Sequence, residues 1–360
     1  MIQEITLNRF KKFKEYTIQL KPFSVLTGKN GCGKSTILKA INLMIYTLHE
    51  NEMITFKGGH AIIRSKGVGA ADMPGMKISD FRDLYYGKIS RQGKQVVVDE
   101  SKIGASIIIK DENDNVYKML ITSIFGGFNM KCYSQEEDLK NMPSLQIYTP
   151  LYISGFTGIQ MMEEKVFPVI MQKQMTRGGQ SSIIRNMILR LRKVKYEQYQ
   201  ELKELMAEEF SFCIDRVECN ENKEIYVKAS FLTECGDDMV SMDFDNASDG
   251  ELQVLQILSA IYLSCPDQCK VVLIDNPEAY LHPEFQRKLV RVLKRMQREM
   301  RIQIILATHS REIMDEVDKE EVMIIDEEAA NHGRGDQMSE KVMGEGEKKK
   351  IRGEQLTLEL

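Results

Sequence analysis

The sequence has no long apolar run and no strong excess of charge of one sign. No stretch is apolar enough to cross a bilayer, and no signal-peptide pattern follows Met1, so we expect a cytoplasmic protein without membrane contact. The 360 residues carry a formal net charge of -4. Any contact with nucleic acid therefore needs a local basic patch, because the net charge provides no attractive field.

Cysteine spacing that would suit a structural zinc site is also missing. Of the 7 cysteines, only Cys265 and Cys269 form a close pair, and no second pair accompanies them. An odd, dispersed set of cysteines is typical of reduced thiols in a cytoplasm. The remaining composition, 42% hydrophobic and 28% charged, is ordinary for a globular protein with room for one large domain or two.

A phosphate-binding loop is present near the N-terminus. Residues 28–36 read GKNGCGKST and fit the pattern G-x-x-x-x-G-K-[ST]. Glycines let backbone N–H groups surround phosphate oxygens, Lys34 reaches the β- and γ-phosphates, and Ser35 offers its hydroxyl to Mg²⁺. The apolar stretch 23–27 precedes the loop and helical spacing follows it, which predicts a buried strand, the loop and a helix. The predicted ATP-binding residues here are Gly28, Asn30, Gly31, Gly33, Lys34, Ser35 and Thr36.

A second apolar strand ends in a carboxylate. Residues 271–275 read VVLID, the Walker B pattern, in which a buried strand delivers an acid to Mg²⁺. Alone, this pattern is equally typical of a core strand followed by a turn aspartate, but beside a phosphate loop it favours a metal site. The predicted Mg²⁺ ligands are Ser35 and Asp275.

Two shorter patterns lie on either side of this strand in the chain. Residues 248–251 read SDGE, which fits a capping box, and a capped helix N-terminus is also a site for an anion. His309 follows the apolar strand 302–306. A histidine at such a place is often structural, but its position after the Walker B strand favours a functional role.

Basic residues gather in two places, and each has two interpretations. Arg9, Lys11 and Lys12 connect two strands expected within residues 2–20, and they either contact the adenine and ribose side of a nucleotide or form a solvated hairpin. The helix that begins at Pro283 carries a basic face, which is either solvated or contacts nucleic-acid phosphates. That face consists of Arg287, Arg291, Lys294 and Arg298.

Together these patterns predict an α/β fold, a P-loop NTPase. Its sheet should be mixed and mostly parallel, with an antiparallel edge near the N-terminus and helices on both faces. We expect an N-terminal lobe (1–50), an α+β insertion (51–240) that is β-rich with one long helix at 181–210, and a C-terminal lobe (241–326). Residues 327–360 read as a disordered charged tail.

The order of the motifs resembles the ABC-type ATPase heads of the SMC and RecF class. Residues 5–13 (ITLNRFKKF) and 27–36 (TGKNGCGKST) are similar to that class. Residues 277–283 (PEAYLHP) resemble the OLD-like branch of AAA-family ATP-binding proteins, found in prokaryotic DNA repair and phage defence. The resemblance covers residues 1–50 and 240–326, and the middle of the chain matches no motif.

The resemblance implies a homodimer in which two subunits enclose two ATP molecules. Ser248 and Gly250 of one subunit would contact the γ-phosphate that Lys34 of the other subunit holds, and His309 would sense that phosphate. Asp275 would hold Mg²⁺ through water. The resemblance further implies a glutamine at the metal, for which the candidates are Gln146 and Gln160.

The sequence departs from this class at the residue after the Walker B aspartate. That residue is usually a glutamate that polarises the attacking water, and here it is Asn276, which cannot take a proton. Glu278 is a candidate substitute, so the predicted catalytic residues are Glu278, His309 and Asn276. The departure predicts slow ATP hydrolysis. Asp249 also stands where many relatives have glycine, which we expect to be tolerated.

Two functions follow as alternatives from these features. The first is an ATPase that acts in DNA repair or anti-phage defence with a separate nuclease or toxin as effector, with or without DNA contact. The second is an ATP-switched scaffold that hydrolyses slowly and holds or releases such an effector. A transporter ATPase is disfavoured because the interval from Thr36 to Ser248 is long.

Overall fold

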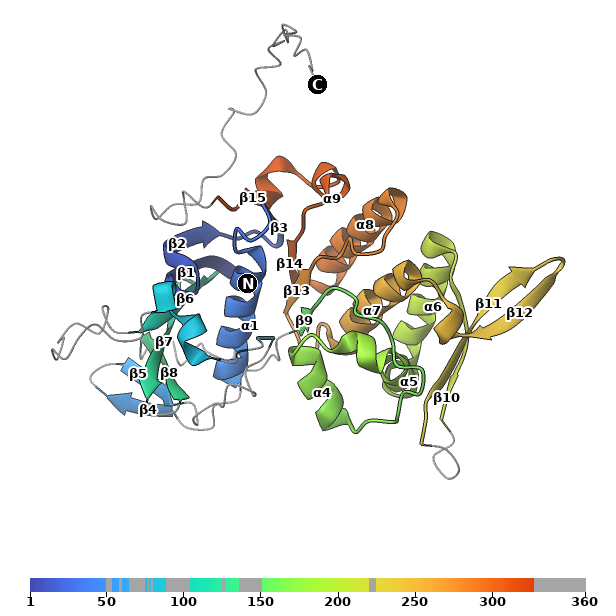
Figure 1. The fold of residues 1–360 in the computed structure, drawn as a ribbon, viewed down its shortest axis with the longest axis horizontal. Helices are drawn as coiled ribbons and strands as arrows, with labels where there is room; N and C mark the ends of the chain where they lie inside the picture. The colour runs from blue at the N-terminus through green and yellow to red at the C-terminus, as the bar shows by residue number, and fades with distance from the viewer. Residues whose placement is uncertain are drawn as a thin grey trace, which may run out of the picture.

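The computed structural model describes most of the chain (Figure 1). The described residues are 1–49, 54–57, 60–64, 75–76, 78, 80–88, 104–124, 127–135, 151–219 and 225–326. The expected tail 327–360 and the candidate Gln146 lie outside them. In the described part of the chain, no helix is long and apolar enough to cross a membrane.

A five-stranded sheet holds the phosphate loop and the Walker B strand. All its strand pairs are parallel, in the order β15-β3-β14-β13-β9. The strands are β3 (Phe23–Thr27), β9 (Leu151–Ile153), β13 (Val271–Asp275), β14 (Gln303–Ala307) and β15 (Val322–Ile324). Because parallel strands end at one edge of a sheet, residues that follow β3, β13 and β14 meet there. The predicted α/β class is confirmed.

Helices cover both faces of this sheet because its strands are apolar on both sides. Leu273 of β13 belongs to the core that includes α1 (Lys34–His49), whereas Ile274 belongs to the core of the opposite face. The opposite core is built from four longer helices and the shorter α4. These helices are α4 (Pro168–Thr176), α5 (Ile184–Val194), α6 (Tyr196–Phe210), α7 (Asp249–Ser264) and α8 (Pro283–Met300).

The antiparallel strands form separate sheets, not an edge of the parallel one. A seven-stranded sheet runs β2-β1-β6-β7-β8-β5-β4, and α1 lies between it and the parallel sheet (Figure 1). Its strands are β1 (Ile2–Phe10), β2 (Phe13–Gln19), β4 (Ile54–Lys57), β5 (His60–Arg64), β6 (Ala105–Asp111), β7 (Val116–Ile124) and β8 (Gly127–Gln135). The expected antiparallel edge was therefore wrong, because β1 has β2 on one side and β6 on the other. The division of the chain into lobes and an insertion stays a proposal.

The expected single long helix at 181–210 was also wrong. A 3-10 turn precedes α5, and α5 ends before Lys195, whose backbone leaves the helical region with φ -140° and ψ 65°. The Lys195 ammonium lies 2.8 Å from the Asp267 carboxylate and donates to the carbonyl of Cys265 at 3.2 Å. This side chain therefore joins the break between α5 and α6 to the end of α7.

The remaining elements extend the helical side of the molecule. A three-stranded antiparallel sheet, β10-β11-β12, follows α6, and its β11–β12 hairpin projects away from the helices (Figure 1). Its strands are β10 (Cys213–Glu218), β11 (Lys228–Cys235) and β12 (Asp238–Asp243). The short elements are η2 (Phe81–Leu84), η3 (Tyr86–Lys88), η5 (Gln180–Ile183), η6 (Phe244–Asn246), α9 (Arg311–Asp315) and η7 (Lys319–Glu321).

Candidate nucleotide-binding site

The phosphate loop joins β3 to α1, and its backbone conformation requires glycine at two positions, Gly28 and Gly33. Gly28 has φ 142°, and a Cβ there would lie 2.4 Å from the carbonyl oxygen of Ile325. Gly33 has φ 114°, and a Cβ there would lie 2.3 Å from the ring of Phe13, which is completely buried. Neither position has room for a side chain, so the loop packs against its neighbours through bare backbone.

Replacing Gly33 by alanine is expected to lower the free energy of unfolding by about 2–3 kcal/mol, because the methyl group meets the buried Phe13 ring at a strained φ. The matched control is Gly31→Ala. Gly31 also has a positive φ, 77°, but its Cβ would meet nothing within 4 Å, so strain alone acts there, about 1 kcal/mol. Urea denaturation measures both variants. Equal losses would contradict the close packing at Gly33.

Lys34 is buried in the loop beside the end of β14. Its ammonium donates to the carbonyl oxygens of Gly28 at 3.0 Å and Lys29 at 3.1 Å. The same nitrogen lies 3.4 Å from Nδ1 of His309, which is exposed at the carboxyl end of β14. The fold thus brings the loop lysine and the strand-terminal histidine together across 275 residues of sequence.

Ser35 and Asp275 meet at the start of α1. The Ser35 hydroxyl donates to Oδ1 of Asp275 at 2.8 Å, and Asp275 is 6% exposed. Among the described residues no group of three His, Cys, Asp or Glu side chains could hold a metal. This pair of oxygen donors fits Mg²⁺, which commonly takes one or two protein ligands and fills its other positions with water and phosphate.

Tyr152 on β9 is a further member of this site, and no sequence motif indicates it. Its hydroxyl donates to Oδ2 of Asp275 at 2.9 Å. Burial, together with the neighbouring carboxylate, raises the pKa of Tyr152 well above its usual range, so the phenol stays protonated and remains a donor. Only the pairing of β9 with β13, which places Tyr152 beside Leu273, brings it to this edge.

The segment after β13 places both Glu278 and Asn276 against the end of β14, where the backbone N–H of Asn276 donates to the carbonyl oxygen of Ala307 at 2.8 Å. Oε1 of Glu278 accepts the backbone N–H of His309 at 2.9 Å, while its Oε2 is buried without a hydrogen-bond partner in the described part of the chain. Asn276 is exposed and has φ 52°. Asparagine tolerates this left-handed conformation better than glutamate does, which gives Asn276 a structural reason besides any catalytic one.

The predicted capping box at Ser248 is present. The Ser248 hydroxyl accepts the backbone N–H of Glu251 at 3.3 Å, and the Glu251 carboxylate accepts the backbone N–H of Ser248 at 2.9 Å. A Cβ at Gly250 would lie 2.8 Å from the carbonyl oxygen of Tyr280, so α7 begins against the loop that contains Glu278. Among the described residues no hydrogen bond joins Ser248 to the phosphate loop.

Two other expectations have mixed outcomes. Lys12 donates to the carbonyl oxygen of Gly31, so the β1–β2 turn touches the phosphate loop. Gln160 is exposed, and its backbone carbonyl accepts a hydrogen bond from Arg185 at 2.7 Å. Among the described residues, no hydrogen bond joins the Gln160 side chain to Asp275. The structure therefore gives no support to Gln160 as the glutamine expected at the metal.

The basic face of α8 is largely paired within the chain. Arg287 pairs with Glu312, Arg291 makes two 3.1 Å hydrogen bonds to the carboxylate of Glu316, and Lys294 pairs with Asp318 and Glu321. Three of the four cations therefore neutralise acids of α9 and the following turn. This arrangement disfavours the nucleic-acid interpretation of the face and supports a structural one.

A buried network connects the segment after β9 with the residues before Ser248. Oε2 of Glu163 accepts the backbone N–H of Arg185 at 2.9 Å, and Oε1 accepts the backbone and side-chain N–H groups of Asn186, both at 2.6 Å. The Arg185 guanidinium, 1% exposed, donates to Asp243 and Asp245 at 2.7 Å each. Burial raises the pKa of Glu163 to about 7, although its hydrogen bonds favour the charged form.

Ionisation of Glu163 should lower the free energy of unfolding by about 2 kcal/mol as the pH is raised from about 5.5 to about 8. The unfolded state already has this carboxyl ionised above its ordinary pKa of 4.5, whereas the folded state keeps it protonated up to about 7. Raising the pH therefore destabilises only the folded state. Urea denaturation at both pH values, with Glu163→Gln as the non-titrating comparison, measures the effect. The same pH dependence in both proteins would contradict it.

The comparison with protein families agrees with this geometry. A family model described as an AAA ATPase domain matches residues 1–247, more than half of the chain. A second model, whose description names an AAA domain, the AbiEii toxin and a type IV TA system, matches residues 186–315. No curated protein sequence matches the chain.

The comparison with solved structures gives the fold. The chain is similar to an Smc head bound to the C-winged helix domain of ScpA, at 16% identity and a TM-score of 0.54 over 90% of this chain and 93% of that one. It is also similar to an Smc head with an extended coiled coil bound to the C-terminal domain of ScpA, from Pyrococcus furiosus, at 13% identity and a TM-score of 0.54 over 92% and 94% of the chains. With an SMC-type head fold and a P-loop, the chain belongs to the AAA ATPase domain family.

Proposed function

We propose that the protein is an ATP-hydrolysing switch whose two subunits close on two ATP molecules and act with a partner effector in DNA repair or anti-phage defence. One set of contacts carries this proposal, at the carboxyl ends of β3, β13 and β14. Lys34 lies beside His309, Ser35 beside Asp275, and Glu278 holds the N–H of His309. These contacts lie at one edge of the parallel sheet, which supports a common site for phosphoryl transfer.

Each residue of this set has a role in the proposal. Lys34 and the loop N–H groups bind the β- and γ-phosphates of ATP. Ser35 and Asp275 hold Mg²⁺, which when bound neutralises charge on the phosphate oxygens. Glu278 accepts the proton of the attacking water, and His309 contacts the γ-phosphate.

The second candidate, a slow ATP-switched scaffold, is favoured by Asn276. An asparagine cannot act as the base, and one of the two carboxylate oxygens of Glu278 is already engaged with the backbone of His309. A turnover number far below the ordinary median of about 10 s⁻¹ supports the scaffold. A turnover above it rejects slow hydrolysis.

ATP turnover with and without single- and double-stranded DNA separates the two candidates, with Lys34→Ala as the blank. Stimulation by DNA that is lost in the blank supports the repair function. Turnover that is slow and indifferent to DNA supports the scaffold, whose effector would then be sought by nucleotide-dependent release from a co-purified neighbour. The paired basic face of α8 leads us to expect that Arg291→Glu with Arg298→Glu leaves any DNA response unchanged.

ATP is expected to convert the protein from monomer to dimer when hydrolysis is blocked by Glu278→Gln. Ser248 and Gly250 at the start of α7 would then meet the γ-phosphate of the other subunit, because a helix N-terminus favours anions. Adding Ser248→Arg should prevent the dimer without affecting ATP binding to the monomer. Light scattering at about 0.5 M salt, where weak ionic contacts are screened, measures both. A monomer in saturating ATP would contradict the proposed dimer.

A further inference from the structure

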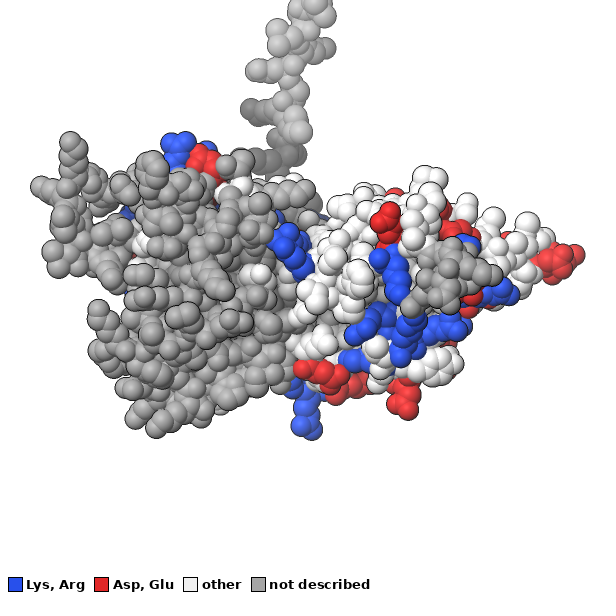
Figure 2. Space-filling model, turned by 90° about the horizontal axis from the view of Figure 1, so that it is seen from below, with Lys and Arg blue, Asp and Glu red and all other residues white. Residues whose placement is uncertain are grey.

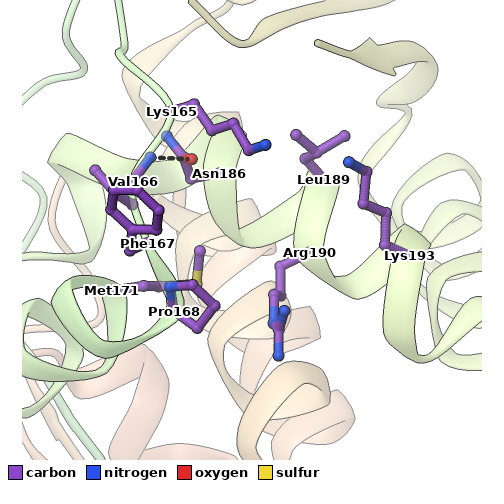
Figure 3. Close-up of a pocket in the computed structure, with 9 residues that line it drawn as sticks. All are labelled: Lys165, Val166, Phe167, Pro168, Met171, Asn186, Leu189, Arg190 and Lys193. Atoms are coloured by element: carbon purple, nitrogen blue, oxygen red, sulfur yellow. Dashed lines mark hydrogen bonds between the residues drawn. The ribbon is translucent and has the colours of Figure 1, made fainter. Parts of the chain in front are cut away.

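A pocket between α4 and α5 combines an apolar floor with a cationic rim (Figure 3). Its volume is about 320 Å³, and a neighbouring hollow of about 210 Å³ shares the lining residues Pro168, Met171 and Arg190. Figure 3 shows Lys165, Arg190 and Lys193 around it. The floor suits apolar side chains and the rim suits carboxylates.

The sequence around the α4–α5 pocket has charge of one sign only. Residues 165–196 contain eight Lys or Arg and no Asp or Glu, and two of these cations, Arg185 and Lys195, pair with acids elsewhere in the chain. Figure 2, which views the molecule from below Figure 1, shows a group of Lys and Arg side chains on the helical half of this face. Large apolar side chains are exposed beside them, with Phe167 75% exposed and Val169 77% exposed. Apolar area left in water beside a charged rim is typical of a protein-binding surface.

The β11–β12 hairpin has the opposite charge and the same apolar character. Residues 229–251 contain no Lys or Arg, and the tip carries Glu234, Asp237 and Asp238, none of which has an ion pair in the described part of the chain. Every residue of β12 is exposed, including Met239 at 56% and Met242 at 40%. Among the described residues, β12 pairs only with β11, and no described strand pairs with its other edge.

The hairpin does not cover the pocket of its own chain. Figure 1 shows the hairpin projecting away from α4 and α5, and acidic side chains lie at its far end in Figure 2. Asp243 at the end of β12 pairs with Arg185 of the same chain, but the tip of the hairpin and the pocket do not meet within one molecule, so these two surfaces can meet between two molecules. Each copy carries one hairpin and one pocket. Two copies can therefore exchange hairpins in a closed dimer, or many copies can associate head to tail in an open chain.

We propose that the tip of the β11–β12 hairpin of one copy docks in the α4–α5 pocket of a second copy. Met239 enters the apolar floor, and Asp237 and Asp238 pair with Arg190 and Lys193. The contact needs no nucleotide and does not involve the phosphate loop, so it is separate from the proposed ATP-dependent dimer. It is small compared with a stable interface, so we expect association only at micromolar concentrations and above.

Charge reversal on either side tests the contact in the full-length protein. Sedimentation velocity without nucleotide, in the Lys34→Ala background, is expected to show association at about 100 µM protein in about 50 mM salt and its loss in about 500 mM salt. The pocket variant carries Arg190→Glu and Lys193→Glu, and the hairpin variant carries Asp237→Lys and Asp238→Lys. Each alone should weaken association at least about tenfold.

An equimolar mixture of the two variants is the decisive measurement. In the mixture, the unchanged acidic hairpin of the pocket variant can dock in the unchanged basic pocket of the hairpin variant. The reversed pocket and the reversed hairpin are again complementary, so the mixture and the chain with all four changes should both regain association. A matched control, Arg295→Glu with Arg298→Glu, has the same change in net charge as the pocket variant and exposed positions on α8, and should associate like the parent.

Three results would overturn the proposal. The first is a parent protein that stays monomeric under these conditions. The second is association that the hairpin variant does not weaken, which would leave the pocket to another partner. The third is a pocket variant that loses binding of a fluorescent single-stranded oligonucleotide while its self-association is unchanged, which would assign the cations to nucleic acid. Circular dichroism of each variant distinguishes a lost contact from a lost fold.

Discussion

Lys34→Ala is expected to lower the rate of ATP hydrolysis by about 10³-fold or more. The ammonium group is buried in the loop, 5% exposed, and lies 3.4 Å from His309 at the carboxyl end of the sheet. Charge develops on the transferred phosphoryl group in the reaction, and a fixed cation in a water-poor loop stabilises it far more than an exposed one does. Steady-state phosphate release measures the loss.

Lys29→Ala is the matched control for this variant. Lys29 is in the same loop, but its side chain is exposed and its backbone carbonyl, which the substitution keeps, is the group that contacts Lys34. We expect Lys29→Ala to retain turnover within a few-fold. If Lys34→Ala hydrolyses ATP as fast as the parent protein, ATP hydrolysis does not depend on the phosphate loop. The proposed active site would then be wrong.

Glu278→Gln is expected to lower the turnover number by about 10²–10⁴-fold while ATP still binds. The glutamine amide keeps the size of the side chain and can still accept the N–H of His309, but it cannot accept a proton from water. Single-turnover hydrolysis together with a nucleotide-binding titration separates the two effects. The loss should fall on the chemical step alone.

The control for the second variant is Glu284→Gln on α8. Glu284 is exposed, and its carboxylate pairs with Lys288, away from the contacts of Glu278. It should change turnover little. Unchanged turnover in Glu278→Gln would show that Glu278 is not the base that accepts the proton of the attacking water. An equal loss in Asn276→Ala with Glu278 intact would instead indicate that Asn276 positions the water.

Local patterns predicted local structure well. The phosphate loop, its buried strand and its helix appear where residues 23–49 predict them, and the capping box of α7 has both expected hydrogen bonds. The Walker B strand occupies residues 271–275 as predicted. Each of these signals lies within one element or its flanking turn, so the cause and the effect are a few residues apart.

Predictions that depended on distant partners were less successful. The charges of α8 looked like a free basic face, but the acids that neutralise Arg287, Arg291 and Lys294 lie about two dozen residues further on. The helix break at Lys195 coincides with a contact to the end of α7, and helical periodicity on both sides conceals the break in the sequence.

The sequence by itself determined the phosphate-loop and Walker B patterns of this AAA ATPase domain, because short spacings and residue chemistry are sufficient for that. Only the tertiary structure decided that β1 joins β6 and not the parallel sheet, and that Tyr152 donates to Asp275. It also decided that Glu278 lies against His309. The physical reason is that strand pairing is non-local: any apolar strand can pair with several others, and the packing of the whole core selects among them.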